Sequence, residues 1–152
     1  MKIILMRHGQ AEDETRPDSA RQLTDFGQQQ AAQTAAYIHE RYMPDLLVVS
    51  PYTRAQQTLA KLQAHAPDIS VKIQNNITPS DDARTAFAEL STIDADCVVV
   101  VCHMSIIAYL GSLLTGEHPE SYALAEARVF DMEFIMAGMA QEIDRFVPTQ
   151  PY

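Results

Sequence analysis

The chain has 152 residues, of which 47% are hydrophobic and 20% are charged, as is typical of one globular domain spanning residues 1–152. Its 11 Lys and Arg residues are outnumbered by 20 Asp and Glu residues, and the net charge of −9 argues against nucleic acids and anionic membranes as partners. No run approaches the roughly 20 apolar residues of a membrane span, and the opening MKIILM is too short for a signal peptide, so we expect a soluble, cytoplasmic protein.

The N-terminal part of the chain alternates short apolar runs with helical patterns. Residues 2–6 (KIILM) form a run that is apolar after Lys2, which is typical of a strand covered on both faces, and the polar segment 11–21 predicts a surface loop. Thr24 is a candidate N-cap for a helix over 25–43, which ends before a proline. A second buried strand is expected at 46–49.

The same alternation continues toward the C-terminus and then changes. We expect, in order, a helix at 53–65, a short strand at 71–73, a helix at 82–93, an apolar strand at 97–101 and a helix at 106–114. Residues 128–136 and 141–147 alternate apolar and polar side chains around Ala137-Gly138, which predicts a hairpin. Strands that alternate with helices favour a parallel sheet. The sequence therefore predicts an α/β fold, a single three-layer α/β/α domain with a mostly parallel central sheet and antiparallel C-terminal edge strands.

The spacing of the two cysteines bears on cofactors and on the cell compartment. Cys97 and Cys102 lie an odd number of residues apart in one apolar run, so a strand would place them on opposite faces, where they cannot form a disulfide. Neither CxxC nor HExxH spacing occurs, so we expect no metal and no other cofactor. Unbridged cysteines fit a reducing cytosol.

Residues with phosphate-binding chemistry follow three of the predicted strands. These residues are Arg7-His8-Gly9 after the first strand, Arg54 after the second, and His103 after the strand at 97–101. Ligands of a parallel sheet bind beyond the carboxyl ends of its strands, so we expect these segments to meet at one rim. Their guanidiniums and imidazoles suit a dianionic phosphoryl group, and Arg21 in the loop could add another guanidinium.

Taken singly, each of these residues has a simpler explanation. His103 alone could be a turn residue, Arg54 a solvated charge on a helix, and Arg7 the partner of an acid such as Glu12 or Asp13. A thiol nucleophile next to His103 is a further alternative, although a cysteine inside an apolar strand is more often part of the core. The functional interpretation therefore depends on the residues in combination.

In combination, four motifs resemble those of the histidine phosphatase superfamily, also called phosphoglycerate mutase-like. They are, in order, RHG (7–9), LTDFGQQQA (23–31), SPYTRAQQT (50–58) and VVCH (100–103). The short chain, the segment SARQLT (19–24) and the segment ITP (77–79) are most similar to the SixA-type phosphohistidine phosphatases of that superfamily. The resemblance implies a phosphoglycerate mutase-like fold and a phosphatase.

The resemblance also implies a role for each residue of the motifs. His8 would be the nucleophile that forms a covalent phosphohistidine intermediate, while Arg7, Arg54 and His103 would bind the phosphoryl oxygens and stabilise the transition state. Arg21 and Gly9 would assist phosphate binding, Gly9 by letting the backbone turn sharply after His8. A neutral imidazole is a competent nucleophile, and neighbouring arginines discourage its protonation.

The segment 75–87 (NNITPSDDARTAF) departs from the pattern of relatives that act on sugar phosphates. Those relatives carry a glutamate there that protonates an alkoxide leaving group, and this segment has none. Asp81 or Asp82 could donate the proton, but helix capping explains them better. An imidazole leaving group demands less acid catalysis, which favours a phosphohistidine on a signalling protein, such as a histidine-phosphotransfer domain, as the substrate and inorganic phosphate as the product.

Two alternatives remain open from the sequence. One is a small-molecule phosphatase or mutase that acts on sugar or acyl phosphates, which would need an identifiable acid and extra binding residues over the site. The other is a non-catalytic phosphate-binding module, which would require the loss of His8 or of an arginine, and all of these residues are present.

Overall fold

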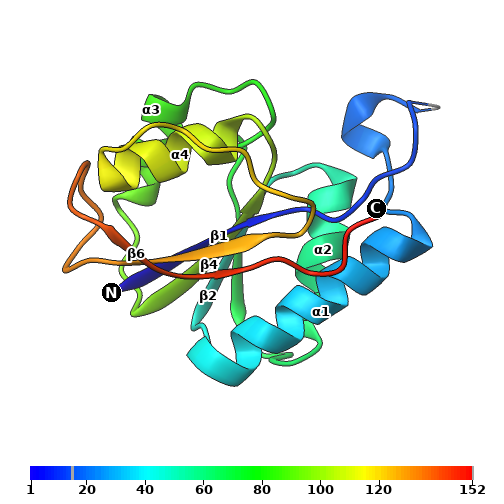
Figure 1. The fold of residues 1–152 in the computed structure, drawn as a ribbon, viewed down its shortest axis with the longest axis horizontal. Helices are drawn as coiled ribbons and strands as arrows, with labels where there is room; N and C mark the ends of the chain where they lie inside the picture. Colours follow the sequence, from blue (N-terminus) through cyan, green and yellow to red (C-terminus); the bar gives the residue numbers. More distant parts are fainter. Residues whose placement is uncertain (15, 152) are drawn as a thin grey trace.

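A six-stranded sheet forms the centre of the computed structural model, which describes residues 1–14 and 16–151 (Figure 1). Its strands are β1 (Lys2–Arg7), β2 (Leu46–Val49), β3 (Ser70–Ile73), β4 (Cys97–Cys102), β5 (Ala127–Asp131) and β6 (Gln141–Phe146). They lie in the order β3-β2-β4-β1-β5-β6. β1 pairs with β4, β4 with β2, and β2 with β3, all in parallel, so the carboxyl ends of these four strands share one edge. Thr15, within the predicted loop, and Tyr152 lie outside the described residues.

Helices cover both faces of the sheet (Figure 1). They are α1 (Asp25–Tyr42), α2 (Thr53–Gln63), α3 (Ala83–Leu90) and α4 (Ile106–Thr115), preceded by a short 3₁₀ turn, η1 (Asp18–Ala20). Side chains of β1 alternate between the two layers: Ile3 and Leu5 pack with α3 and α4, whereas Ile4 and Met6 pack with α1 and α2. The period of two along the strand thus creates two apolar cores. The predicted three-layer α/β/α architecture is confirmed.

Side-chain caps account for the first residues of two helices. The Thr24 hydroxyl accepts a hydrogen bond from the Gly27 N–H at 2.9 Å, which satisfies one of the unpaired donors at the start of α1. At the start of α3, the Asp82 carboxylate likewise accepts a hydrogen bond from the Thr85 N–H at 3.2 Å. The predicted N-cap of α1 and the capping interpretation of Asp82 are both confirmed.

The C-terminal strands differ in detail from the predicted edge hairpin. β5 is antiparallel to both β1 and β6 and lies between them, so of these two C-terminal strands β6 alone lies at an edge of the sheet. The predicted antiparallel C-terminal hairpin at one side of the sheet is confirmed, with β6 rather than β5 as its outermost strand. β5 also ends at Asp131, because the connection that follows binds α4: Gly138 and Ala140 donate their N–H groups to the carbonyls of Leu113 and Leu114 at 2.8 and 2.9 Å. Carbonyls in the last turn of a helix lack intrahelical partners, and this segment supplies donors for them.

The two cysteines are free and buried. Cys97 packs in the core beneath α1 and α2, whereas Cys102 packs in the core beneath α3 and α4. The prediction that they face opposite sides of one strand is confirmed.

In the described residues, 1–14 and 16–151, no helix is both long enough and apolar enough to cross a bilayer.

Candidate active site

The parallel pairing of β1 and β4 brings two histidines together. Arg7 lies opposite Cys102 at the ends of these strands, so the next residues, His8 and His103, leave the sheet side by side. The His8 N–H donates to the Cys102 carbonyl at 3.1 Å, and the two imidazole rings have centroids 5.1 Å apart. Arg54, on the first turns of α2, donates from Nε to His8 Nε2 at 3.2 Å. The predicted meeting of the three segments at one rim is confirmed.

The hydrogen bonds of His8 define which ring nitrogen carries the proton. Nδ1 lies 2.7 Å from the carbonyl oxygen of Gly9, and because a carbonyl only accepts, Nδ1 must be the protonated nitrogen. Nε2 therefore has a lone pair, in agreement with the hydrogen bond that it accepts from Arg54. Burial, together with the nearby positive charges of Arg54 and Arg7, lowers the pKa of His8 to about 3. His8 is thus a neutral imidazole at physiological pH, with an unprotonated Nε2.

His103 is fully buried beside His8. Its Nε2 lies 2.7 Å from the Ser50 hydroxyl oxygen, which also accepts the Tyr52 N–H at 3.2 Å. Burial lowers the pKa of His103 to about 2, so this ring is neutral as well. When Ser50 donates its only proton to Nε2, the ring carries its own proton on Nδ1. Within residues 1–14 and 16–151, this buried Nδ1 has no hydrogen-bond partner.

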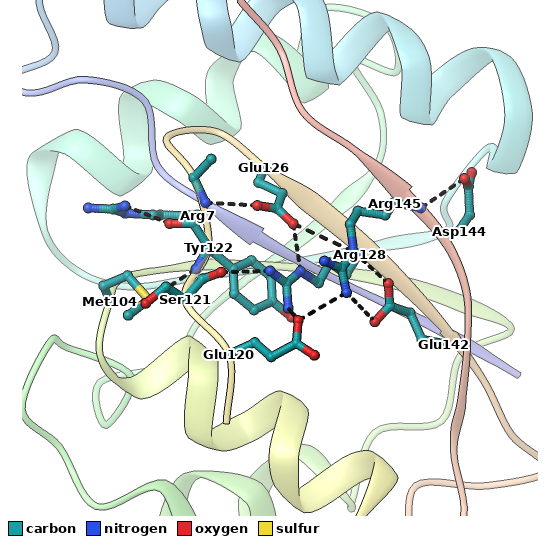
Figure 2. A network of polar contacts seen from close by, with 11 residues as sticks. Arg7, Met104, Glu120, Ser121, Tyr122, Glu126, Arg128, Glu142, Asp144 and Arg145 are labelled. Carbon is teal, nitrogen blue, oxygen red and sulfur yellow. Dashed lines mark hydrogen bonds and ion pairs between the residues drawn. The ribbon is translucent and has the colours of Figure 1, made fainter. Parts of the chain in front are cut away.

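Arg7 is held by backbone carbonyls of the segment that leads into β5. Its Nη1 donates to the Tyr122 carbonyl at 2.7 Å, and its backbone N–H donates to the Glu126 carbonyl at 3.0 Å. Figure 2 shows the side chain of Arg128 reaching back toward this segment. Arg128 Nη2 donates to the Ser121 carbonyl at 2.7 Å, and its guanidinium carbon lies 3.9 Å from the centre of the Tyr122 ring. The segment whose Tyr122 carbonyl orients Arg7 is therefore itself anchored by Arg128, which is buried.

Glu126 completes this support (Figure 2). One of its carboxylate oxygens accepts from Arg128 Nε at 2.6 Å, and the other accepts from the Ala123 N–H at 2.8 Å. The sequence analysis missed both residues as parts of the site. The only signal in the sequence was a charged pair, two residues apart, at the start of an otherwise apolar strand.

Arg54 is held by the loop that precedes α1. Its Nη1 donates to the backbone carbonyl of Asp18 at 2.6 Å, and its Nη2 lies 3.3 Å from the Asp18 carboxylate. Arg21 binds the same carboxylate through Nε at 3.0 Å and donates from Nη1 to the Glu12 carbonyl at 2.9 Å. Asp18 is another residue that the sequence analysis missed, because nothing in a polar loop distinguishes it from its acidic neighbours.

These side chains surround an open cleft of about 350 Å³. Its lining consists of Arg7, His8, Gln10, Ala11, Asp18, Arg21, Arg54, Pro79, Met104 and Leu124. Three guanidiniums and the His8 ring therefore face one cavity, with the buried His103 ring beside them. Planar guanidinium forks and an available imidazole nitrogen together suit a tetrahedral oxyanion.

Gly9 has a different structural role from the predicted one. A Cβ at Gly9 would collide with the carbonyl oxygen of Gly27 in α1, and a Cβ at Gly27 would collide with the carbonyl oxygen of Gln10. The described glycines with positive φ are Gly116 and Gly138, so close packing against α1, rather than a sharp turn, explains Gly9. The Gly9 N–H is already used by the Thr58 hydroxyl at 3.2 Å.

Asp81 and Asp82 lie away from the other predicted site residues. Asp81 accepts a hydrogen bond from the Thr78 N–H at 2.8 Å, and Asp82 caps α3. Both line a groove with Tyr109 of α4, and neither lines the cleft that contains His8. Asp18 is the carboxylate that does line this cleft.

Comparisons with known proteins agree with this geometry. The model of the histidine phosphatase superfamily (branch 1) matches residues 3–78. The phosphohistidine phosphatase SixA homolog of Haemophilus influenzae is 30% identical over 129 residues, which cover 77% of this chain and 79% of that protein. Phosphohistidine phosphatase SixA of Escherichia coli is 29% identical over 129 residues, which cover 80% of each chain.

Solved structures share the fold over nearly the whole chain. The protein histidine phosphatase SixA complexed with tungstate superposes with a TM-score of 0.89 at 25% identity and covers 97% of each chain. A mycobacterial glucosyl-3-phosphoglycerate phosphatase has the same fold at 18% identity, with a TM-score of 0.74 over 97% of this chain and 99% of that one. The family model and the curated relatives together establish that this chain belongs to the histidine phosphatase superfamily.

Proposed function

We propose that this protein is a phosphohistidine phosphatase that works through a covalent phosphohistidine on His8. The observation that carries the proposal is the state of the His8 ring: a buried, neutral imidazole whose Nε2 is unprotonated and faces a guanidinium in an open cleft. An unprotonated nitrogen is the form that can attack phosphorus. The surrounding guanidiniums supply positive charge where the transition state gathers negative charge.

The reaction has two steps on the same nitrogen. In the first, the lone pair of His8 Nε2 forms a bond to phosphorus while the bond from phosphorus to the leaving imidazole breaks, and that imidazole takes up a proton from water in the open cleft. In the second, water attacks phosphorus, the bond to Nε2 breaks, and inorganic phosphate leaves with the neutral ring restored. Arg7 and Arg54 bind the phosphoryl oxygens, Arg21 assists them, and His103 donates from Nδ1.

The cleft favours phosphohistidine over an alkyl phosphate as the substrate. Hydrogen bonds and charge from Arg21 and Arg54 hold the pKa of the Asp18 carboxyl below its ordinary value, so the carboxylate that lines the cleft cannot protonate an alkoxide. An imidazole leaving group needs weaker acid catalysis. The open cleft would also admit a side chain carried on another folded protein, and two curated relatives are named phosphohistidine phosphatases. We accordingly propose a histidine-phosphotransfer protein as the partner, and residues 1–152 as a single cytoplasmic domain.

Replacement of His8 tests the covalent mechanism. We expect His8→Ala to abolish phosphate release from a phosphohistidine-carrying transfer domain, and acid-labile radiolabel from that substrate to be trapped on wild type but not on His8→Ala. His118→Ala is the matched control, because His118 is exposed and does not line the cleft. Full activity of His8→Ala would overturn the mechanism.

A substrate panel tests the leaving-group argument separately. We expect kcat/KM to be highest for the phosphohistidine protein and low for 3-phosphoglycerate and fructose bisphosphates. A sugar phosphate that is turned over at least about tenfold faster would contradict the proposed substrate, since a tenfold difference in kcat/KM corresponds to about 1.4 kcal/mol in the transition state. It would leave the chemistry at His8 intact.

A further inference from the structure

The carboxylate of Asp18 occupies the arginine donors that a phosphoryl group would need. Its Oδ2 lies 3.3 Å from Arg54 Nη2, and its Oδ1 accepts from Arg21 Nε at 3.0 Å. The neighbouring donor of Arg54, Nε, points at His8 Nε2 at 3.2 Å. The Arg54 guanidinium therefore binds both the attacking nitrogen and Asp18, while Arg21 binds Asp18 through Nε and the Glu12 carbonyl through Nη1.

Phosphoryl binding must change this arrangement. Once phosphorus is bonded to His8 Nε2, that nitrogen no longer has a lone pair to accept from Arg54, and the Nε–H must bind a phosphoryl oxygen instead. The donors of a guanidinium lie in one plane and bind oxyanions in pairs, so Nη2 follows Nε toward the same phosphoryl group. Asp18 Oδ2 then competes with a phosphoryl oxygen for Nη2.

The balance of charge explains why a carboxylate is present at this point. Burial and the positive charge of Arg54 lower the pKa of Arg7. Burial and the charge of Arg21 lower the pKa of Arg54, whereas the negative charge of Asp18 raises it. Without an anion, three guanidiniums would face one cleft with no compensating charge from its lining. Asp18 supplies that charge while the cleft contains no phosphate.

Asp18 is also placed so that its side chain can leave without moving the loop. The side chain is 50% exposed, whereas that of Arg54 is only 3% exposed. The backbone carbonyl of Asp18 is bound independently by Arg54 Nη1 at 2.6 Å. The carboxylate can therefore rotate into solvent while the backbone keeps its hydrogen bond.

We propose that Asp18 is a positioning residue that acts as an exchangeable internal counter-ion: it holds Arg54 and Arg21 in place in the free enzyme, yields them to the phosphoryl group, and competes with inorganic phosphate for them after hydrolysis. The exchange rests on the proposed phosphatase function. It makes product release easier at a site whose three arginines would otherwise retain phosphate.

The sign of a change in phosphate affinity tests this exchange. We expect Asp18→Asn and Asp18→Ala to bind inorganic phosphate roughly three- to tenfold more tightly than wild type, because a competing carboxylate has been removed from two arginines. Binding is measured by isothermal titration calorimetry with inorganic phosphate, and as the product-inhibition constant. KM for the phosphohistidine protein should fall together with the dissociation constant for phosphate, while kcat should not rise.

Glu14→Gln is the matched control. Glu14 is an exposed carboxylate in the same loop that does not line the cleft, so this variant makes the same change in net charge and should bind phosphate within twofold of wild type. Circular dichroism on both Asp18 variants establishes that they are folded.

Two results would overturn the inference, and they differ in what else they affect. If wild type binds phosphate and the Asp18 variants bind it equally or more weakly, Asp18 merely aligns the arginines, and the exchange is wrong while the phosphatase stands. If wild type itself neither binds inorganic phosphate nor releases it from the phosphohistidine protein, the proposed function fails and the exchange fails with it.

Discussion

Arg54 and Arg128 are both buried arginines paired with a carboxylate, but their partners differ in exposure. The side chain of Asp18 is 50% exposed and lies 3.3 Å from Arg54, whereas that of Glu126 is 4% exposed and lies 2.6 Å from Arg128. A carboxylate in contact with water can exchange for another anion at little cost. A carboxylate enclosed in protein cannot, because any departure leaves a buried charge without compensation. The first pair adjoins the reacting group, and the second anchors the chain that orients Arg7.

Removal of the enclosed carboxylate should have the largest effect on stability. We expect Glu126→Ala to lower the free energy of unfolding by about 3–5 kcal/mol, because Arg128 is left buried without its nearest anion. Urea denaturation monitored by circular dichroism measures the change. In the fraction that remains folded, kcat should also fall, since the Tyr122 carbonyl binds Arg7 and Arg128 holds the Tyr122 ring and the neighbouring Ser121 carbonyl.

A control for this prediction lies on the neighbouring strand. Glu142→Ala removes a carboxylate from a partly exposed pair with Arg145, and exposed pairs contribute at most about 1 kcal/mol. If Glu126→Ala and Glu142→Ala destabilised the protein equally, the contrast between enclosed and exposed carboxylates would be wrong.

The next effect in size is on catalysis at the exchangeable pair. Arg54→Lys keeps the positive charge but loses the planar fork that reaches His8 and Asp18 together, so we expect kcat to fall about 100-fold, with a much smaller loss of stability. Steady-state kinetics and urea denaturation on the same preparation separate the two effects. A kcat equal to that of wild type would mean that Arg54 contributes only its charge.

A separate expected effect is the pH dependence of stability that the two neutral histidines impose. The pKa values of His8 and His103 are lowered to about 3 and about 2, against an ordinary value near 6.5. Below pH 6.5 the unfolded chain therefore binds protons that the folded chain does not, and stability falls as pH falls from about 6.5 toward 3. Each histidine contributes up to about 1.4 kcal/mol per pH unit in this range.

Urea denaturation between pH 7 and pH 5 checks this slope. His8→Ala should lower the slope, since one of the two titrating groups is removed. A slope that is the same in wild type and His8→Ala would contradict a neutral, buried His8.

Most of the elements, and the residues of the four motifs, can be predicted from the amino-acid sequence alone. Apolar runs of 4–6 residues define β1, β2 and β4, and local hydrogen bonds define the capped ends of α1 and α3. These features depend on residues a few positions apart, so periodicity and side-chain chemistry suffice to predict them. Because the carboxyl ends of parallel strands share an edge, the meeting of His8, Arg54 and His103 could also be predicted.

The surroundings of these residues depend instead on how the chain packs. Asp18 contacts Arg54 across 36 positions of the chain, and Tyr122 contacts Arg7 across 115, and no local pattern encodes such contacts. The same holds for β5, whose apolar alternation fits an edge strand and an internal strand equally well. Its place depends on pairing with β1, and the length of the hairpin depends on unpaired carbonyls at the end of α4. Long-range pairing and the burial of charge are properties of the packed chain, and they determine which carboxylate can exchange and which cannot.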